Sequence, residues 1–241
     1  MQEHLFISDL HLSSDRPDTI ELFLRFLRER AVQAGSLFIL GDLFDAWVGD
    51  DNKTPPIPEI LAAMKTLTLT ETDLYFMAGN RDFLVGEAFA NDTGCQLLQD
   101  PHVLQLTESQ ALLMHGDLLC SDDRDYQAWR IRLRTPAVIG ELLSKSIEER
   151  IAIAAEYRRR SGESTSLKAA DIIDVNQLTV EQYLRDAGAR LLIHGHTHRP
   201  ANHRFELDGT AANRMVLPEW GDRTGGYLSI RSDAIGRHVF I

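Results

Sequence analysis

Aspartate, histidine and asparagine residues recur in five short clusters along the chain, and each cluster follows an apolar run. The clusters are Asp9-Leu10-His11, Gly41-Asp42, Gly79-Asn80-Arg81-Asp82, His115-Gly116-Asp117 and His194-Gly195-His196-Thr197-His198. Short apolar runs that end at such residues are typical of buried strands. In open α/β sheets ligands bind beyond the carboxyl ends of the strands, so we expect the five clusters to form one site.

The donor groups in these clusters are those of a metal centre. Carboxylate, amide and imidazole groups without a thiolate suit Mn²⁺, Fe²⁺ or Zn²⁺ better than a closed structural zinc site. Several candidate ligands allow two ions, which a carboxylate such as Asp42 can bridge, and two-metal sites hydrolyse phosphate esters or anhydrides. The alternative is that each cluster is only a cap or a glycine turn. Five clusters in this order favour the metal centre.

Strands and helices alternate around the clusters. Strands are predicted at residues 5–7, 37–40, 74–77, 103–106, 111–114 and 191–193, with a strand-rich tail at 204–207, 215–217, 227–230 and 238–241. Helical spacing of apolar residues predicts one helix around Ile20, Phe23, Leu24 and Leu27, and another over residues 57–67. The alternation predicts a layered α/β fold.

A helical cap is predicted within a single domain of residues 1–241, at about residues 124–168. Residues 126–160 are helical in pattern with a break at Pro136, and residues 158–164 are predicted to be a loop. The segment 124–168 has ten Lys or Arg residues against six Asp or Glu, in a chain of net charge −11, so an anionic partner is expected there. The alternative is an ordinary amphipathic hairpin packed on the domain.

Composition excludes several classes of protein. Hydrophobic residues make up 44% and charged residues 25% of the 241 residues, as in soluble globular domains. We find no signal peptide and no apolar run of the roughly 20 residues that span a bilayer. Cys95 and Cys120 form no C-x-x-C motif, which fits a reducing cytosol. The acidic net charge argues against a nucleic-acid partner.

The order of the clusters resembles the calcineurin-like metallophosphoesterase superfamily, whose motifs are D-x-H, G-D, G-N-H-[DE], H-G and G-H-x-H. The resemblance runs from Asp9 to His198 and implies a four-layer α/β/β/α sandwich. It also implies that one metal is held by Asp9, His11, Asp42 and His198, and the other by Asp42, Asn80, His115 and His196. His194 lies outside the motif.

One position departs from the superfamily pattern, because Arg81 stands where most members have a histidine that resembles a general acid. An alkoxide leaving group needs such an acid, whereas a phosphate leaves as a stable anion. Arg81 offers a permanently charged fork for phosphate oxygens. The substitution favours cleavage of a pyrophosphate over cleavage of a simple ester.

Longer stretches are similar to the UDP-2,3-diacylglucosamine pyrophosphohydrolase family of bacterial lipid A biosynthesis. They are residues 5–12, 39–51, 79–84, 114–117 and 193–200. The resemblance implies an enzyme with two Mn²⁺ ions per chain. Its products are UMP and 2,3-diacylglucosamine 1-phosphate, and it acts at the cytoplasmic face of the inner membrane as a peripheral protein. We expect a monomer.

Site residues are implied by the same resemblance. The catalytic residues are Asp42, Asn80, Arg81 and His196, and the substrate contacts are Asn80, Arg81, Asp123, Tyr126, Arg158, Ser161, Thr165, Lys168 and His196. Position 165 is often Asn in the family and is Thr here. If Arg158, Ser161 and Lys168 hold the sugar phosphate, water attacks the α-phosphorus, nearer to uridine.

Two other functions are compatible with the motifs. One is a different two-metal enzyme of the same fold, such as a nucleotide pyrophosphatase or a cyclic-nucleotide phosphodiesterase, which Arg81 and the cap disfavour. The other is a metal-stabilised binding protein, whose metal site would be closed and inactive. An assay of UDP-sugars with and without acyl chains separates the two enzymes.

Overall fold

Two mixed β-sheets stack face to face in the computed structural model, which describes residues 3–107, 109–167, 174–231 and 234–241, without the side chains of 161–167. The first sheet has the order β11-β10-β1-β2-β3-β4. Its strands are β1 (His4–Ile7), β2 (Ser36–Leu40), β3 (Asp73–Met77), β4 (Gln96–Leu98), β10 (Gly225–Arg231) and β11 (Ala234–Phe240). The second has the order β5-β6-β7-β9-β8. It contains β5 (His102–Gln105), β6 (Gln110–Met114), β7 (Leu191–His194), β8 (Asn202–Leu207) and β9 (Thr210–Val216).

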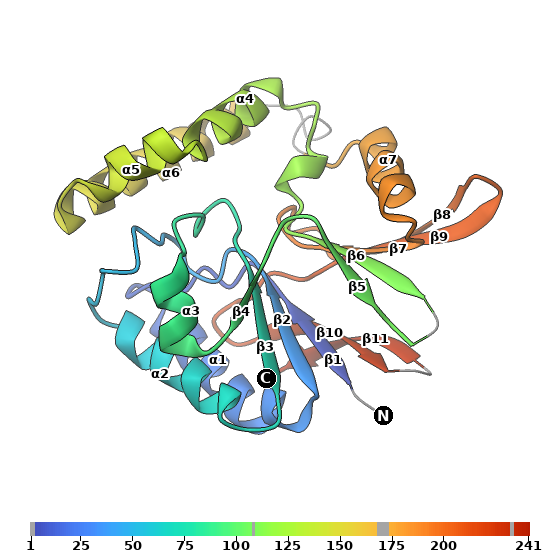
Figure 1. The fold of residues 1–241 in the computed structure, drawn as a ribbon, viewed down its shortest axis with the longest axis horizontal. Helices are drawn as coiled ribbons and strands as arrows, with labels where there is room; N and C mark the ends of the chain where they lie inside the picture. Colours follow the sequence, from blue (N-terminus) through green and yellow to red (C-terminus); the bar gives the residue numbers. More distant parts are fainter. Residues whose placement is uncertain (1–2, 108, 168–173, 232–233) are drawn as a thin grey trace.

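Helices cover the outer faces of both sheets, which makes four layers (Figure 1). The first sheet is covered by α1 (Pro17–Glu29), α2 (Ile57–Thr68) and α3 (Glu87–Thr93), and the second by α7 (Gln177–Ala187). The predicted α/β/β/α sandwich is therefore confirmed. Helices α3 and α7 and strand β4 had not been predicted.

Successive side chains of the central strands pack alternately against the helices on one side and the second sheet on the other. In β1, Leu5 and Ile7 face the core under α1 and α2, while Phe6 faces the second sheet. Phe38 of β2 follows the same rule and stacks on Phe6, with ring centroids 5.0 Å apart. Because successive residues of a strand point to opposite faces, an almost wholly apolar strand must be buried on both sides. Apolar strands without polar alternation thus predict the interior of a sandwich.

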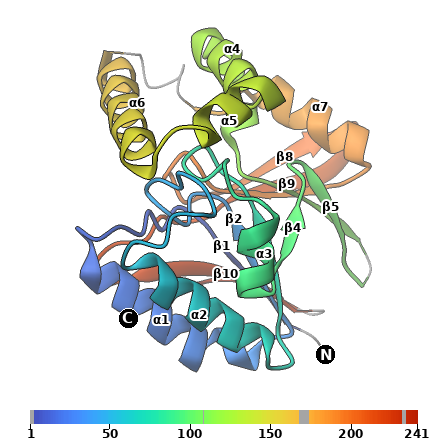
Figure 2. The same ribbon diagram turned by 60° about the vertical axis from the view of Figure 1, so that its left-hand side comes forward.

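Three more helices lie apart from the layers, over one end of both sheets (Figures 1 and 2). They are α4 (Arg124–Leu133), α5 (Pro136–Leu143) and α6 (Ile147–Leu167). Pro136 stands at the start of α5, where a proline lacks no needed hydrogen bond. We call these three helices the cap. None of the helices in the described ranges is long and apolar enough to cross a membrane.

The predicted loop at residues 158–164 is wrong, because α6 continues through it to Leu167. Glu156 pairs with Arg159 and Arg160, three and four residues further along the helix. Such pairs stabilise a helix, and arginine and glutamate are good helix formers, so they outweigh the single Gly162 in this segment.

Candidate active site

The five polar clusters lie together beyond the carboxyl ends of β1, β2, β3, β6 and β7, as the strand pattern predicts. Two groups of side chains have their donor atoms within 4.8 Å of one another: Asp9, His11 and His198, and Asp9, Asp42 and His115. Asn80 joins them, because its Oδ1 lies 2.9 Å from His115 Nε2 and 3.0 Å from His196 Nδ1. All seven predicted metal ligands therefore belong to one cluster.

Backbone conformation at this cluster is unusual. Five of the predicted ligands have a positive φ, namely Asp9 (56°), His11 (51°), Asp42 (53°), His196 (69°) and His198 (53°). Residues other than glycine rarely adopt this region, and where they do they concentrate at functional sites. Close packing also fixes the glycine beside Asn80, since a Cβ on Gly79 would lie 2.2 Å from Asp42 Oδ1. Gly79 is thus more than a turn residue.

Hydrogen bonds outside the cluster orient the ligand groups. His115 Nδ1 lies 2.9 Å from the Leu40 carbonyl, and His198 Nδ1 lies 2.7 Å from Glu219 Oε2, so both Nε2 atoms point inward. Buried Asp82 accepts hydrogen bonds from the backbone amides of Asp42, Leu43 and Gly79. Such outer contacts fix the tautomer and orientation of metal-binding side chains.

The charges of the cluster are those of a cation site. Burial lowers the pKa of His11 to about 3 and that of His196 to about 4, so both imidazoles are neutral at pH 7, as metal ligation requires. Burial also raises the pKa of Asp42. It lowers that of His115, but the carboxylates of Asp42, Asp117 and Asp9 raise the latter to about 9. Without a metal ion, the buried carboxylates draw a proton onto His115.

The donor set fits divalent metal ions. His11 Nε2 and His198 Nε2 are only 3.3 Å apart, and His198 Nε2 is 3.4 Å from Asp9 Oδ1. Two inward-facing imidazole nitrogens beside a buried carboxylate leave electron pairs that a cation satisfies. Asp9, His11, Asp42 and His198 would hold one ion, and Asp42, Asn80, His115 and His196 the other.

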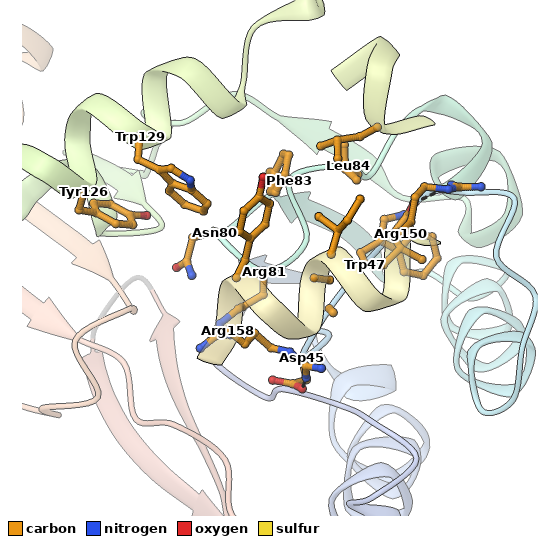
Figure 3. Close-up of a pocket in the computed structure, with 16 residues that line it drawn as sticks. Asp45, Trp47, Asn80, Arg81, Phe83, Leu84, Tyr126, Trp129, Arg150 and Arg158 are labelled. Carbon is orange, nitrogen blue, oxygen red and sulfur yellow. Dashed lines mark hydrogen bonds and ion pairs between the residues drawn. The ribbon is translucent and has the colours of Figure 1, made fainter. Parts of the chain in front are cut away.

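A pocket extends from this cluster to beneath the cap (Figure 3). The space between its lining side chains is about 660 Å³, a figure that includes volume open to solvent. Asn80, Arg81 and Tyr126 line the end near the metal ligands. The remainder is lined mainly by the apolar side chains Trp47, Val48, Phe83, Leu84, Trp129, Leu142, Ile153 and Tyr157.

The structure places the predicted substrate contacts unequally. Arg158 lies in the pocket wall with Asn80, Arg81 and Tyr126, and the Tyr126 ring is 6.2 Å from that of His196. The Asp123 carboxylate accepts a hydrogen bond from the Tyr126 amide and so caps α4. The backbone of α6 includes Ser161 and Thr165, whose side chains the structure does not describe, and Lys168 lies outside the described residues.

Helix α4 is tied to the cluster by contacts of Asp117, Arg130 and Arg134, for which the sequence predicts no individual role. The buried carboxylate of Asp117, two residues after His115, accepts hydrogen bonds from the Tyr126 hydroxyl (2.9 Å) and from Arg130 Nε (2.6 Å). Arg134 donates to the Gly79 carbonyl at 2.9 Å. The Tyr126 hydroxyl is thereby fixed as a donor to Asp117 and can only accept from a ligand. The H-G-D sequence was the one available signal for Asp117.

Comparison with known families decides the identity of the fold. The model of the calcineurin-like phosphoesterase family matches residues 4–200. The chain belongs to this family. Its cluster therefore stands where a calcineurin-like phosphoesterase holds its two metal ions.

Within the calcineurin-like phosphoesterases, the chain is similar to several proteins named UDP-2,3-diacylglucosamine hydrolase. It is 48% identical to that of Pseudomonas paraeruginosa over 94% of both chains. The identity to that of Pseudomonas aeruginosa is 46% over 94% of both chains. The identity to that of Marinobacter nauticus is 46% over 90% of this chain and 89% of that protein.

Proposed function

We propose that the protein hydrolyses the pyrophosphate bond of UDP-2,3-diacylglucosamine and releases UMP and 2,3-diacylglucosamine 1-phosphate, a step of lipid A biosynthesis. The observation that carries the proposal is an apolar pocket that begins at the metal cluster and contains Arg81 at that end. Only a substrate with both a phosphate and a long apolar part uses both ends. Relatives named for this substrate match almost the whole chain.

The chain's residues have separate roles in this reaction. Asp9, His11, Asp42, Asn80, His115, His196 and His198 would hold two metal ions, which we propose to be Mn²⁺; such ions would supply an activated water and neutralise phosphoryl charge. Arg81 binds the phosphate oxygens through a fixed fork of donors. Since both possible leaving groups are phosphates, neither needs the general acid that Arg81 replaces.

We propose an orientation of the substrate that uses the two ends of the pocket. The acyl chains lie under the cap, and Arg158, with Ser161, Thr165 and Lys168, binds the sugar phosphate. Asp123 and Tyr126 contact the substrate at the end of the pocket near the metal ligands. The uridine-side phosphorus then lies beside Asn80 and His196, and water attacks it with departure of the acylated sugar 1-phosphate.

The cap at about residues 124–168 acts as a lid for the acyl chains within one domain of residues 1–241. We further propose that the protein is a monomer that attaches peripherally to the cytoplasmic face of the inner membrane, where its substrate resides.

Product analysis tests the reaction and the direction of attack together. The protein is incubated with Mn²⁺ and UDP-2,3-diacylglucosamine in ¹⁸O-water, with UDP-N-acetylglucosamine in a parallel reaction. We expect turnover of the acylated substrate alone, with the label in UMP. Label in the sugar phosphate would reverse the orientation, and equal turnover of both substrates would indicate a general nucleotide pyrophosphatase instead.

A further inference from the structure

One carboxylate stands among the cations of the pocket. Asp45 lies in the loop after β2, three residues beyond Asp42, and forms an ion pair with Arg158 of α6. Both residues line the pocket, and Figure 3 shows them side by side, with Arg158 on α6. Apart from this pair, the charged residues of the pocket wall are Arg81 and Arg150. Asp45 is therefore the single acidic residue in the described wall.

Arg150, on the same helix, is bonded almost completely within the protein and provides a contrast. It donates to both oxygens of Asp51 and to the backbone carbonyls of Val48 and Lys145, and its side chain is 3% exposed. This arrangement fixes the start of α6 to the loop after β2. Four of the five N–H donors of Arg150 are thus bonded inside the protein, which leaves at most one for a ligand.

Arg158 is engaged much less completely. Its side chain is 36% exposed and its partner Asp45 is 28% exposed, so water screens the pair. Within the described part of the chain, Arg158 Nε is buried and has no hydrogen-bond partner. A planar guanidinium with a free donor can bind a phosphate through two parallel hydrogen bonds. The ion pair with Asp45 uses only some of the hydrogen-bond donors of Arg158.

We propose that Asp45 occupies the place of the substrate's phosphate on Arg158 in the unliganded protein and is displaced from Arg158 when that phosphate binds. This inference rests on the proposed function, in which Arg158 binds the sugar phosphate. The exchange involves no covalent step, because one anion replaces another on the same guanidinium. Between turnovers Asp45 holds Arg158 at the pocket wall, and during product release it competes with the departing sugar phosphate.

The variant Asp45→Asn keeps the size of the side chain and removes the competing charge. We expect the KM for UDP-2,3-diacylglucosamine to fall about two- to fivefold, the factor typical of a partly exposed ion pair. In the Arg158→Ala background, the Asp45→Asn change should leave KM unaltered. A KM that rises in Asp45→Asn to the value of Arg158→Ala would show that Asp45 positions Arg158 for the substrate, and the exchange would be wrong.

A matched control is Glu156→Gln. Glu156 belongs to the same helix, is similarly exposed at 39% and pairs with Arg159 and Arg160 outside the pocket. We expect its KM to equal that of the wild type. An equal decrease in both variants would mean that the net charge of the cap, rather than the contact with Arg158, sets KM, which also overturns the proposal.

A binding measurement separates this inference from the proposed reaction. The Mn²⁺-loaded protein is titrated with inorganic phosphate and followed by calorimetry, and the Arg158→Ala background accounts for phosphate bound elsewhere in the site. We expect tighter binding by Asp45→Asn than by the wild type, and no such difference in the Arg158→Ala background. If the wild type failed to hydrolyse the acylated substrate, the reaction would be wrong while this titration would still decide the exchange. Equal phosphate affinity of Asp45→Asn and wild type would refute it.

Discussion

Asp42 and Arg81 are neighbours in space, but their side chains face different parts of the site. The backbone amide of Arg81 donates to Asp42 Oδ1 at 2.9 Å, so the two residues share one hydrogen bond. The Asp42 carboxylate faces the metal cluster, whereas the Arg81 side chain lines the pocket. Substitutions of their side chains should therefore separate loss of metal from loss of phosphate binding.

Asp42→Ala is expected to lower kcat by on the order of 10³-fold or more, because a two-metal site provides several kcal/mol of charge stabilisation. The metal content per chain, measured by atomic emission, should fall as well. The thermal unfolding midpoint of the metal-free protein should change little. Near-normal turnover in this variant is incompatible with the proposed metal ligands.

Arg81→Ala is expected to lower kcat by about 10²-fold, the usual effect of removing one donor to transition-state charge. Its metal content should equal that of the wild type, since only its backbone amide contacts Asp42. Arg81→Lys should recover part of the activity because it keeps the charge without the fork. Loss of metal from Arg81→Ala would show that the Arg81 side chain supports the metal cluster, and its proposed role in phosphate binding would be wrong.

Helix α4 depends on a group of buried charges where the β4–β5 connection meets the cap. Arg130 contacts Asp117 at 2.6 Å and approaches Asp100 at 3.8 Å. Both Asp100 oxygens are buried and have no hydrogen-bond partner among the described residues. Burial, with the nearby Asp117 carboxylate, raises the pKa of Asp100 to about 6. The charged form of Asp100 therefore lowers the free energy of unfolding.

The raised pKa of Asp100 predicts a pH-dependent stability. An unfolded aspartate has a pKa of about 3.9, so between about pH 4 and pH 6 the folded protein binds the extra proton. The free energy of unfolding contributed by this group therefore falls as the pH rises through that window. Asp100→Asn should be more stable than the wild type by on the order of 2 kcal/mol at pH 7.5.

Urea unfolding at several pH values measures this effect, and the advantage of Asp100→Asn should shrink at pH 5. Asp92→Asn is the control, because Asp92 is an exposed carboxylate paired with Lys53. The free energy of unfolding of Asp92→Asn should differ little from that of the wild type at every pH. A destabilised Asp100→Asn protein at pH 7.5 would mean that the Asp100 charge stabilises Arg130.

Strands and helices could be predicted from the sequence where the pattern of neighbouring residues determines them. The apolar runs before Asp9, Asp42 and His115 are strands because both faces are buried, and the metal ligands follow directly. The four-layer arrangement was implied by the family resemblance and not by these patterns, and the order of strands in the two sheets was not predicted. The contacts of Asp117, Asp45 and Asp100 join segments distant in sequence, so no local pattern contains them.

The short elements that were missed show the same limit. Strand β4 has only three residues, two of them exposed, and it exists because it pairs with β3. Helix α7 has a capping asparagine, Asn176, whose side chain accepts from the Thr179 amide, and Gly188 ends it in the left-handed conformation. These signals were available in the sequence. The extension of α6 through Gly162 depends on side-chain pairs that composition alone does not reveal.

The whole molecule combines an acidic net charge of −11 with a basic cap. Exposed apolar side chains of the cap include Ile131, Leu143 and Ile151, and the cations Arg124 and Arg132 lie on the same helix as Ile131. Apolar groups next to cations attract a protein to anionic lipid surfaces. The remainder of the surface is acidic and should be repelled by anionic lipid, so we expect the protein to attach through the cap.

Flotation with vesicles tests this orientation. We expect co-flotation with vesicles containing phosphatidylglycerol at low salt, and release at high salt, since each basic residue contributes about 1 kcal/mol that salt screens. Vesicles of phosphatidylcholine alone should bind less. Ile131→Glu should weaken flotation without changing the thermal unfolding midpoint. Indifference to lipid under all conditions would argue against peripheral attachment.

The central position of β1 has a consequence for biosynthesis. This first strand lies between β2 and β10, and the Trp220 amide donates to the Asp9 carbonyl at 3.1 Å. An emerging chain can pair β1 with β2 early, but β10 and Trp220 leave the ribosome more than 200 residues later. Pairing across such a distance is slow, and metal binds a completed site. We therefore expect metal to be acquired only after translation has passed Arg231.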